Sequence, residues 1–242
     1  MKNQILGKVQ SVLETLSGSQ KPLSIKELSA QLSLPLPTLS RLCSDLIEMG
    51  LIEKTDYHHL VPGISLIRYG NMAAEISPLL NISGAMIRDY AWKNGLNALL
   101  YGYDRNKFFK IFDCAKQYSE PRKAFWRTGA FQVLLAASGK NLQCALEEIG
   151  KIFPDVTVEE KLIIEREYEK LLKEKILVRS GINRHYAVTI PFRYREIYCA
   201  VSFYGHISKE NNPEKVYFES LRIVNRIRAE LYRGGMVDDE SE

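Results

Sequence analysis

The sequence predicts an N-terminal winged helix-turn-helix domain, mainly α-helical with a small β-hairpin, followed by a C-terminal α+β domain. Three observations predict this fold class. They are two short helical patterns separated only by residues 33–35, two short strand patterns directly after them, and a longer region that mixes helical and alternating patterns. We place the winged domain at residues 1–62, a linker helix at 63–77 and the second domain at 78–242. A chain of 242 residues is long enough for two such domains.

The winged domain is expected to begin with two amphipathic helices. The first covers residues 4–17, and its predicted buried face consists of Ile5, Val9, Val12, Leu13 and Leu16. The second starts at Ile25, because Ser24 and Glu27 have the spacing of a capping box, in which two side chains satisfy free backbone amides at a helix start. Its predicted buried stripe is Ile25, Leu28 and Leu32.

The third helix begins in "PLPTLSRLCSDLIEMG", residues 35–50, and has a small, polar outer face. Pro37 suits the first turn, where no helical amide partner is lost, and Gly50 is typical of the residue that ends a helix. The expected buried stripe is Leu39, Leu42, Cys43, Leu46 and Met49. Residues 51–55 and 58–61 then have strand patterns around a turn, which completes a winged unit.

Small side chains on an exposed helix face let its backbone approach the base edges in the major groove of DNA. The candidate contacts on this helix are Leu36, Pro37, Thr38, Ser40, Arg41 and Ser44. Arg41 suits a guanine or a phosphate, and Leu36 suits a thymine methyl group. Lys54, His58 and His59 on the hairpin would reach a flanking phosphate or the minor groove. Two alternatives stay open: a winged helix also serves as a protein-interaction module, and the two histidines also fit a solvated hairpin tip.

The composition limits the kind of DNA binding and the compartment. The net charge is +4, divided as +1 over residues 1–70 and +3 over the remainder, so neither part binds nucleic acid through charge alone. Binding would depend on shape, on a few placed contacts and on an oligomer. No apolar run is long enough to span a membrane, and the N-terminus has no signal-peptide pattern. The four cysteines have no CxxC spacing, so we expect reduced thiols in a cytoplasmic protein without a metal or cofactor.

The second domain shows alternating helical and strand patterns. After the linker helix, whose pattern covers residues 64–76, helices are expected from Pro78 to 94, at 128–138, at 158–175 and at 213–233. Strands are expected at residues 96–104, 107–115, 185–192 and 196–205, with tight turns at 104–106 and 193–195. The predicted inward residues of the last helix are Val216, Leu221, Val224, Ile227 and Leu231.

The motifs of the common hydrolase, nucleotide-binding and zinc-protease sites do not occur in the sequence. It contains no GxSxG, P-loop or HExxH pattern. His185 and Cys199 could meet across the predicted hairpin, but a buried histidine beside a cysteine is more often packing than chemistry. We therefore expect no enzymatic activity.

Three stretches resemble the IclR-type transcriptional regulators, the isocitrate lyase regulator family. They are "LSIKELSAQLSLPLPTLSRLCSDLIEMGLIEK" in the first domain, and "TGAFQVLLA" and "AVTIPFRYREIYCAVSFYG" in the second. The resemblance implies a GAF-like second domain that binds a small molecule, often an organic or aromatic acid. It also implies a homodimer or homotetramer whose effector changes the placement of the DNA-binding heads on a double-stranded operator. The sequence departs from the family at Phe131, usually glycine, and at Gln132, often lysine.

The resemblance also places an effector site in the second domain. The residues carried over are Gly129, Ala130, Phe131, Ala187, Thr189, Ala200, Ser202 and Tyr204. The alternative is that these positions are core and that Phe131 fills the hollow. We further expect Thr128 to cap the short helix, so that an effector carboxylate docks on the helix N-terminus beneath Arg122, Lys123 or Arg127. The alternative for these three cations is an exposed basic loop.

Overall fold

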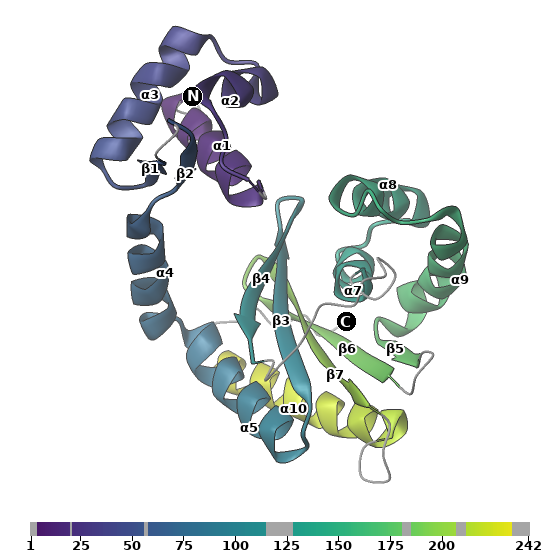
Figure 1. Ribbon diagram of the computed structural model, residues 1–242. Helices are drawn as coiled ribbons and strands as arrows, with labels where there is room; N and C mark the ends of the chain where they lie inside the picture. The colour runs from purple at the N-terminus through teal and green to yellow at the C-terminus, as the bar shows by residue number, and fades with distance from the viewer. Residues whose placement is uncertain are drawn as a thin grey trace. The chain divides into compact units, whose positions relative to one another are not determined.

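The computed structural model describes residues 4–19, 21–55, 58–114, 128–180, 185–206 and 212–233. Its contacts divide the chain into two compact units, Met1–Ser77 and Pro78–Glu242. Figure 1 shows a mainly helical first unit and a second unit built on an antiparallel sheet. The predicted fold class, a winged helix-turn-helix followed by an α+β domain, is confirmed.

The first unit contains four helices and a two-stranded sheet among its described residues. They are α1 (Gln4–Gly18), α2 (Ile25–Leu32), α3 (Leu36–Glu48), β1 (Ile52–Lys54), β2 (Leu60–Pro62) and α4 (Ile64–Ile76). β1 and β2 pair antiparallel, and Leu23 forms an isolated bridge to Leu60 through two backbone hydrogen bonds of 3.1 and 2.7 Å. The bridge ties the start of α2 to the hairpin.

The ends of the helices in the first unit follow the capping rules. The Ser24 hydroxyl accepts from the backbone amide of Glu27, and the Glu27 carboxylate accepts from the backbone amide of Ser24, so the predicted capping box is confirmed. The hydrogen bonds from Ser24 lower the pKa of Glu27 to about 2. After α3, Gly50 has a φ of +68°, a left-handed conformation that glycine adopts at little cost.

The core of the first unit is the meeting point of α1, α2, α3 and the hairpin. Its fully buried side chains include Val12, Leu28, Leu39, Cys43, Ile52 and Leu60. Two residues predicted to be buried are exposed instead: Ile5 is 63% exposed and Met49 is 61% exposed. Ile5 lies in the first turn of α1, and Met49 caps the C-terminus of α3, where the chain leaves the packed face.

The second unit is built on a five-stranded antiparallel sheet in the order β4-β3-β7-β6-β5. The strands are β3 (Asn97–Asp104), β4 (Lys107–Asp113), β5 (Leu177–Ser180), β6 (His185–Tyr194) and β7 (Ile197–His206). The helices are a π-helical turn η1 (Leu80–Gly84), α5 (Ala85–Lys93), α7 (Gly129–Ala137), α8 (Leu142–Ile152), α9 (Val158–Glu174) and α10 (Pro213–Arg233). In Figure 1, α5 and α10 lie on one face of the sheet, and α7, α8 and α9 lie on the other.

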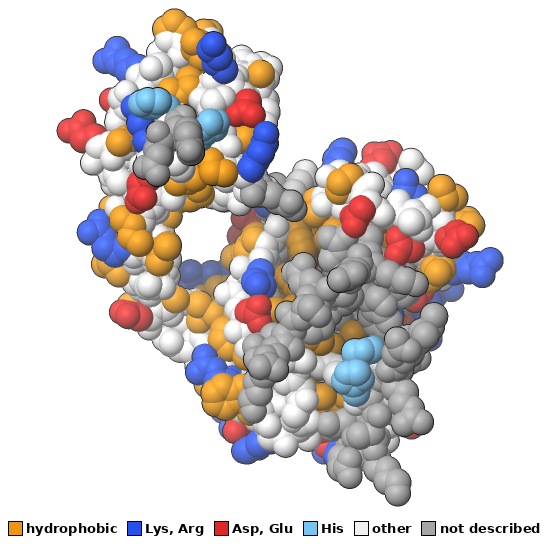
Figure 2. All heavy atoms as spheres, viewed as in Figure 1, with side chains coloured by type: hydrophobic (Ala, Val, Ile, Leu, Met, Phe, Trp, Pro, Cys, Tyr) orange, Lys and Arg blue, Asp and Glu red, His pale blue; other side chains and the backbone are white. Residues whose placement is uncertain are grey.

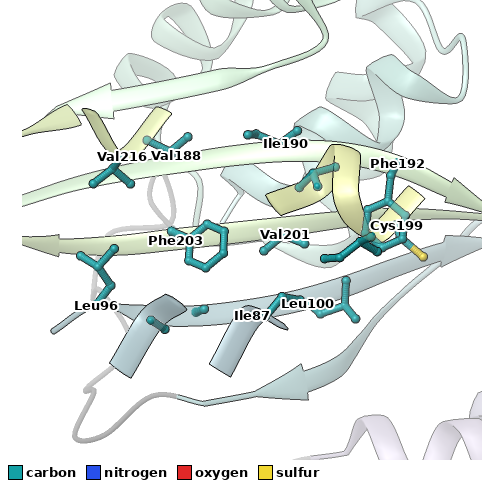
Figure 3. Close-up of a cluster of buried hydrophobic side chains, with 14 of the residues drawn as sticks. Ile87, Leu96, Leu100, Val188, Ile190, Phe192, Cys199, Val201, Phe203 and Val216 are labelled. Carbon is teal, nitrogen blue, oxygen red and sulfur yellow. The ribbon is translucent and has the colours of Figure 1, made fainter. Parts of the chain in front are cut away.

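Each face of the sheet carries its own hydrophobic core. Figure 3 shows the core toward α5 and α10, in which Val188 and Ile190 of β6 lie beside Val201 and Phe203 of β7. On the opposite face, α7 is almost entirely buried: every residue from Gly129 to Ala136 is buried. Because successive residues of a strand point to opposite faces, β6 and β7 supply both cores with alternate side chains.

The turn between β3 and β4 is confirmed. Arg105 and Asn106 both have positive φ, 48° and 61°, as a two-residue hairpin turn requires. The turn between β6 and β7 differs from the prediction at residues 193–195. Tyr194 still pairs with Ile197, so the strand is longer than predicted, and the turn residues are Arg195 and Glu196, with Arg195 at a φ of 53°.

Two elements had no counterpart in the sequence prediction. They are α8, which begins after the Asn141 cap, and β5, the four-residue edge strand. In the last helix, Val216, Val224, Ile227 and Leu231 are buried as predicted, whereas Leu221 is only partly buried.

Candidate DNA-binding surface and effector site

The outer face of α3 carries the residues predicted to contact DNA. All six are exposed: Leu36, Pro37, Thr38, Ser40, Arg41 and Ser44. The opposite face buries Leu39, Cys43 and Leu46, which fixes the helix against the core of the first unit. The Ser44 hydroxyl donates to the Ser40 carbonyl oxygen at 3.0 Å, so it adds little bulk to the outer face. Arg41 is therefore the one cation that α3 presents.

The turn between α2 and α3 sets the direction of α3. Ser33 adopts a left-handed conformation with a φ of 53° and closes α2. The Leu34 amide donates to the Ser29 carbonyl oxygen at 3.2 Å, and the Ser29 hydroxyl donates back to the Leu34 carbonyl oxygen at 2.6 Å. Pro35 then precedes α3, and Pro37 lies in its first turn, where its missing amide costs no hydrogen bond.

The hairpin residues predicted to reach DNA lie near the tip of the wing. Lys54 and His58 are exposed, and His59 is half-buried. The Thr55 amide donates to the His59 carbonyl oxygen at 2.8 Å, and the His58 amide donates to the Thr55 carbonyl oxygen at 3.0 Å. These backbone bonds join the two sides of the hairpin next to both histidines. The geometry is compatible with either sequence interpretation of the pair.

The predicted effector residues of β6 and β7 lie in one row on the face that α7 covers. Ala187 pairs with Tyr204, and Thr189 pairs with Ser202. The Thr189 and Ser202 hydroxyl oxygens are 2.7 Å apart and buried, so they form a hydrogen-bonded pair within an otherwise apolar surface. Ala200 is fully buried one step along the row.

A buried polar network, which sequence reasoning missed, lies at the start of α7. Arg179 of β5 is 4% exposed, and its Nε and Nη2 atoms lie 3.0 and 2.6 Å from Oε2 of Glu167 on α9. Nη2 also donates to Oε1 of Gln132 at 3.1 Å. Burial lowers the pKa of the Arg179 guanidinium, and the carboxylate of Glu167 opposes that shift.

The expected cap on α7 is wrong. Thr128 has helical dihedral angles, φ −79° and ψ −15°, and makes no side-chain cap; instead its hydroxyl accepts from Nε2 of Gln132 at 2.9 Å. An N-cap side chain needs an extended backbone to reach the amide three residues on, and Thr128 does not adopt it. Arg122, Lys123 and Arg127, which were expected to close over an effector carboxylate, lie outside the described residues.

The first residues of α7 are buried and closely packed. A Cβ atom on Gly129 would lie 3.1 Å from Nη1 of Arg179, so the guanidinium approaches the helix closely at this glycine. Phe131 is fully buried, with its ring 4.9 Å from that of Phe108 and 5.9 Å from that of Tyr103 between centroids. This aromatic cluster fits the alternative interpretation in which Phe131 is a core residue. Ala130 is also buried.

A cavity of 720 Å³ lies elsewhere in the second unit, between α9, β5 and the start of α10. Glu167 and Leu177 are among its lining residues, whereas none of the predicted effector residues lines it. Glu167 therefore both lines this cavity and pairs with Arg179.

His185 and Cys199, which the sequence allowed to meet across the hairpin, do not meet. His185 pairs across the ladder with His206, and Cys199 pairs with Phe192 on the opposite face, where burial raises the pKa of its thiol to about 12. The imidazole centroids of His185 and His206 are 3.9 Å apart. Partial burial, followed by the neighbouring His206, lowers the pKa of His185. None of the described helices combines the length and the apolar character needed to cross a membrane.

The first unit is a winged helix-turn-helix whose third helix exposes mainly small or polar side chains, and the second unit is an α+β domain. This combination defines a two-domain protein of the winged-helix DNA-binding class. Residues 6–56 match the family model of the IclR helix-turn-helix domain, so the first unit is a member of that domain family. Comparison with curated proteins found none that matches the chain.

Solved structures of IclR-family regulators share the fold of nearly the whole chain. The IclR family transcriptional regulator from Brucella abortus has a TM-score of 0.70 at 15% identity, over 95% of this chain and 92% of its own. An IclR homologue from Microbacterium hydrocarbonoxydans, solved with 4-hydroxybenzoate, has a TM-score of 0.63 at 16% identity, over 95% and 99%. The regulator from Alicyclobacillus acidocaldarius has a TM-score of 0.63 at 17% identity, over 95% and 96%.

Proposed function

We propose that this protein is a transcriptional regulator whose first unit binds a double-stranded operator and whose second unit binds a small organic acid that controls this binding. The observation that carries the proposal is the exposed outer face of α3 within an IclR helix-turn-helix domain. Small residues there let the backbone come close to base edges, and Arg41 provides the charged contact. The proposed recognition surface also includes Leu36, Pro37, Thr38, Ser40 and Ser44. In this proposal, Lys54, His58 and His59 contact a flanking DNA phosphate or the minor groove.

We propose that the regulator is a homodimer or a homotetramer. α4 supports this, because no residue of this 13-residue helix is buried although it carries several large apolar side chains. The exposed ones are Ile64, Ile67, Tyr69, Met72 and Ile76. Figure 2 shows hydrophobic side chains at the surface along α4. A second copy would cover this apolar surface and would place two recognition helices roughly 34 Å, or a multiple, apart along the operator.

The replacement Arg41→Ala tests the DNA-binding proposal. We expect it to weaken binding to the DNA upstream of the protein's own gene by about 1–3 kcal/mol, because it removes a charge-assisted contact to a base or a phosphate. Gel shifts at several salt concentrations provide the measurement. If Arg41 contacts a phosphate, the log–log salt slope, roughly −4.5 for five phosphate contacts, becomes shallower by about 1.

The matched control for this experiment is Arg166→Ala, an exposed arginine of α9 in the second unit. It removes the same charge and should leave the affinity for DNA unchanged. Unaltered binding in Arg41→Ala would contradict the assignment of α3 as the recognition helix. If the wild-type protein binds DNA with no salt dependence, or not at all, the winged unit is better described as a protein-interaction module.

The effector proposal concerns the row of Thr189, Ser202, Ala187, Ala200 and Tyr204, next to Gly129, Ala130 and Phe131 at the start of α7. A paired set of buried hydroxyls among apolar walls is typical of a site that orients a small ligand. The Microbacterium structure with 4-hydroxybenzoate supports an aromatic acid as the first ligand to try. Arg127 remains the proposed partner of its carboxylate.

Calorimetry with 4-hydroxybenzoate and with its neutral amide tests the effector site. We expect the acid to bind more tightly than the amide, and Ser202→Ala to weaken binding by about 1 kcal/mol, since it removes a hydroxyl that would bond the ligand. Ser220→Ala is the matched control, because Ser220 is also buried but belongs to α10, which covers the other face of the sheet. Equal affinity for acid and amide would remove the carboxylate from the proposal.

A further inference from the structure

A pair of histidines closes the row of residues on the α7 face of the sheet. His185 is the first residue of β6, His206 is the last of β7, and the two are direct cross-strand partners. They follow the alternation that places Ala187, Thr189, Ser202 and Tyr204 on one face. Both are exposed, and Figure 2 shows histidine side chains in contact at the surface of the second unit.

The separation of the two rings is close to that of a chelating pair. Their centroids are 3.9 Å apart with an angle of 44° between the ring planes. Two imidazoles that bind one metal ion through nitrogens at roughly 2.1 Å have centroids roughly 4.5–5 Å apart. The rings would therefore open by roughly 1 Å, which exposed side chains on fixed strand ends can do by rotation. The backbones of both histidines are held by the continuous β6–β7 ladder, so metal binding has a small entropic cost.

We propose that His185 and His206 form a two-imidazole site for a divalent transition-metal ion of the class that includes Ni²⁺ and Zn²⁺. Imidazole is a preferred ligand of these ions, and affinity for nitrogen sites increases toward Ni²⁺ and Cu²⁺ in the first-row series. Among the described residues no group of three or more His, Cys, Asp and Glu side chains is arranged to hold a metal. In this proposal, water or an anionic ligand completes the coordination. The site is thus open, as in metal centres that take up a further ligand.

Titration calorimetry of the full chain with NiCl₂ tests the site. The measurement is made in a Cys144→Ser background, because Cys144 is an exposed thiol that competes for metal. We expect one Ni²⁺ per chain, and a rise of the melting temperature with added Ni²⁺, since an ion that binds only the folded state stabilises it. His185→Ala and His206→Ala should each lower the affinity at least about tenfold.

The double variant separates chelation from two independent sites. If both rings bind the same ion, each single variant already loses most of the affinity for Ni²⁺, because one ring alone holds the metal weakly. The double variant then loses little more affinity than either single variant. The control is the double replacement of His58 and His59 by alanine, which removes two histidines that are neighbours in sequence at the hairpin tip and should leave this binding unchanged. If either alanine variant fails to fold, His185→Asn and His206→Asn provide the same comparison. Full-affinity binding in a single variant, or two sites of equal affinity, would overturn the proposal.

Discussion

Glu167→Ala is expected to destabilise the second unit by about 3–5 kcal/mol, which is a large share of the stability of most domains. The replacement leaves the Arg179 guanidinium buried without its counter-ion, since the carboxylate lies 2.6 Å from Nη2 and 3.0 Å from Nε. Gln132 provides only a neutral acceptor. Calorimetric unfolding of the full chain measures the loss, and faster hydrogen exchange in β5 and α9 would locate it.

The same helix offers the matched control for this prediction. Glu174 also pairs with a cation, Lys170, but at 3.6 Å, and the side chains of Lys170 and Glu174 are 73% and 55% exposed. Glu174→Ala should therefore cost less than about 1 kcal/mol. If Glu167→Ala is equally mild, water reaches Arg179 and the pair is not buried in solution. Replacing both partners with apolar residues, Glu167→Leu with Arg179→Met, should recover most of the loss, because no buried charge then remains.

Gly63→Ala is expected to destabilise the first unit by about 3 kcal/mol or more through a backbone collision. A Cβ atom on Gly63 would lie 2.3 Å from the carbonyl oxygen of Gly50 and 2.9 Å from the amide nitrogen of Ile52. These atoms belong to the main chain and cannot rotate away. The close approach allows the Gly63 amide to donate to the Leu51 carbonyl oxygen at 2.9 Å and the Ser65 amide to donate to that of Gly50 at 3.1 Å.

The collision would break the junction between the wing and α4. Glu53 of β1 accepts from the Ile64 amide at 2.7 Å, so the wing also caps this helix. Hydrogen exchange at residues 51–66 and the melting temperature of the full chain measure the effect. Gly70→Ala is the control, because none of the described atoms lies within 4 Å of a Cβ atom built at this position in α4. Alanine there should raise the free energy of unfolding by about 0.5–1 kcal/mol. Similar stability of the two variants would contradict the close approach at Gly63.

The winged unit was predictable from sequence because its signals are local. The Ser24–Glu27 cap, the turn at residues 33–35 and Gly50 lie within a few residues of the backbone groups that they satisfy. The apolar spacing in α3 likewise needs only helical periodicity to identify Leu39, Cys43 and Leu46 as buried. The prediction that Met49 is buried was wrong, because the apolar periodicity continues to the end of the helix whereas the packed face ends before it.

The second unit was predicted less completely, since its features depend on residues far apart in the chain. The alternation in β6 and β7 was sufficient to place Thr189 and Ser202 on one face, and their hydroxyls are hydrogen-bonded there. Sequence carried no sign that Arg179 would be buried, because its partners Glu167 and Gln132 are 12 and 47 residues away. α8 and β5 were missed, and β5 in particular is a short strand that is stable only through its pairing with β6.

By itself the sequence determined the winged helix with its small, polar recognition face, the linker helix and the alternating strands of the α+β domain. These follow from caps, turns and periodicity, which act over a few residues. Only the tertiary structure decided that Thr128 bonds Gln132 instead of capping α7, that a buried ion pair lies beside Gly129, and that His185 meets His206 instead of Cys199. These depend on strand register and on the packing of α7 and α9, and such long-range geometry is set by the folded chain as a whole.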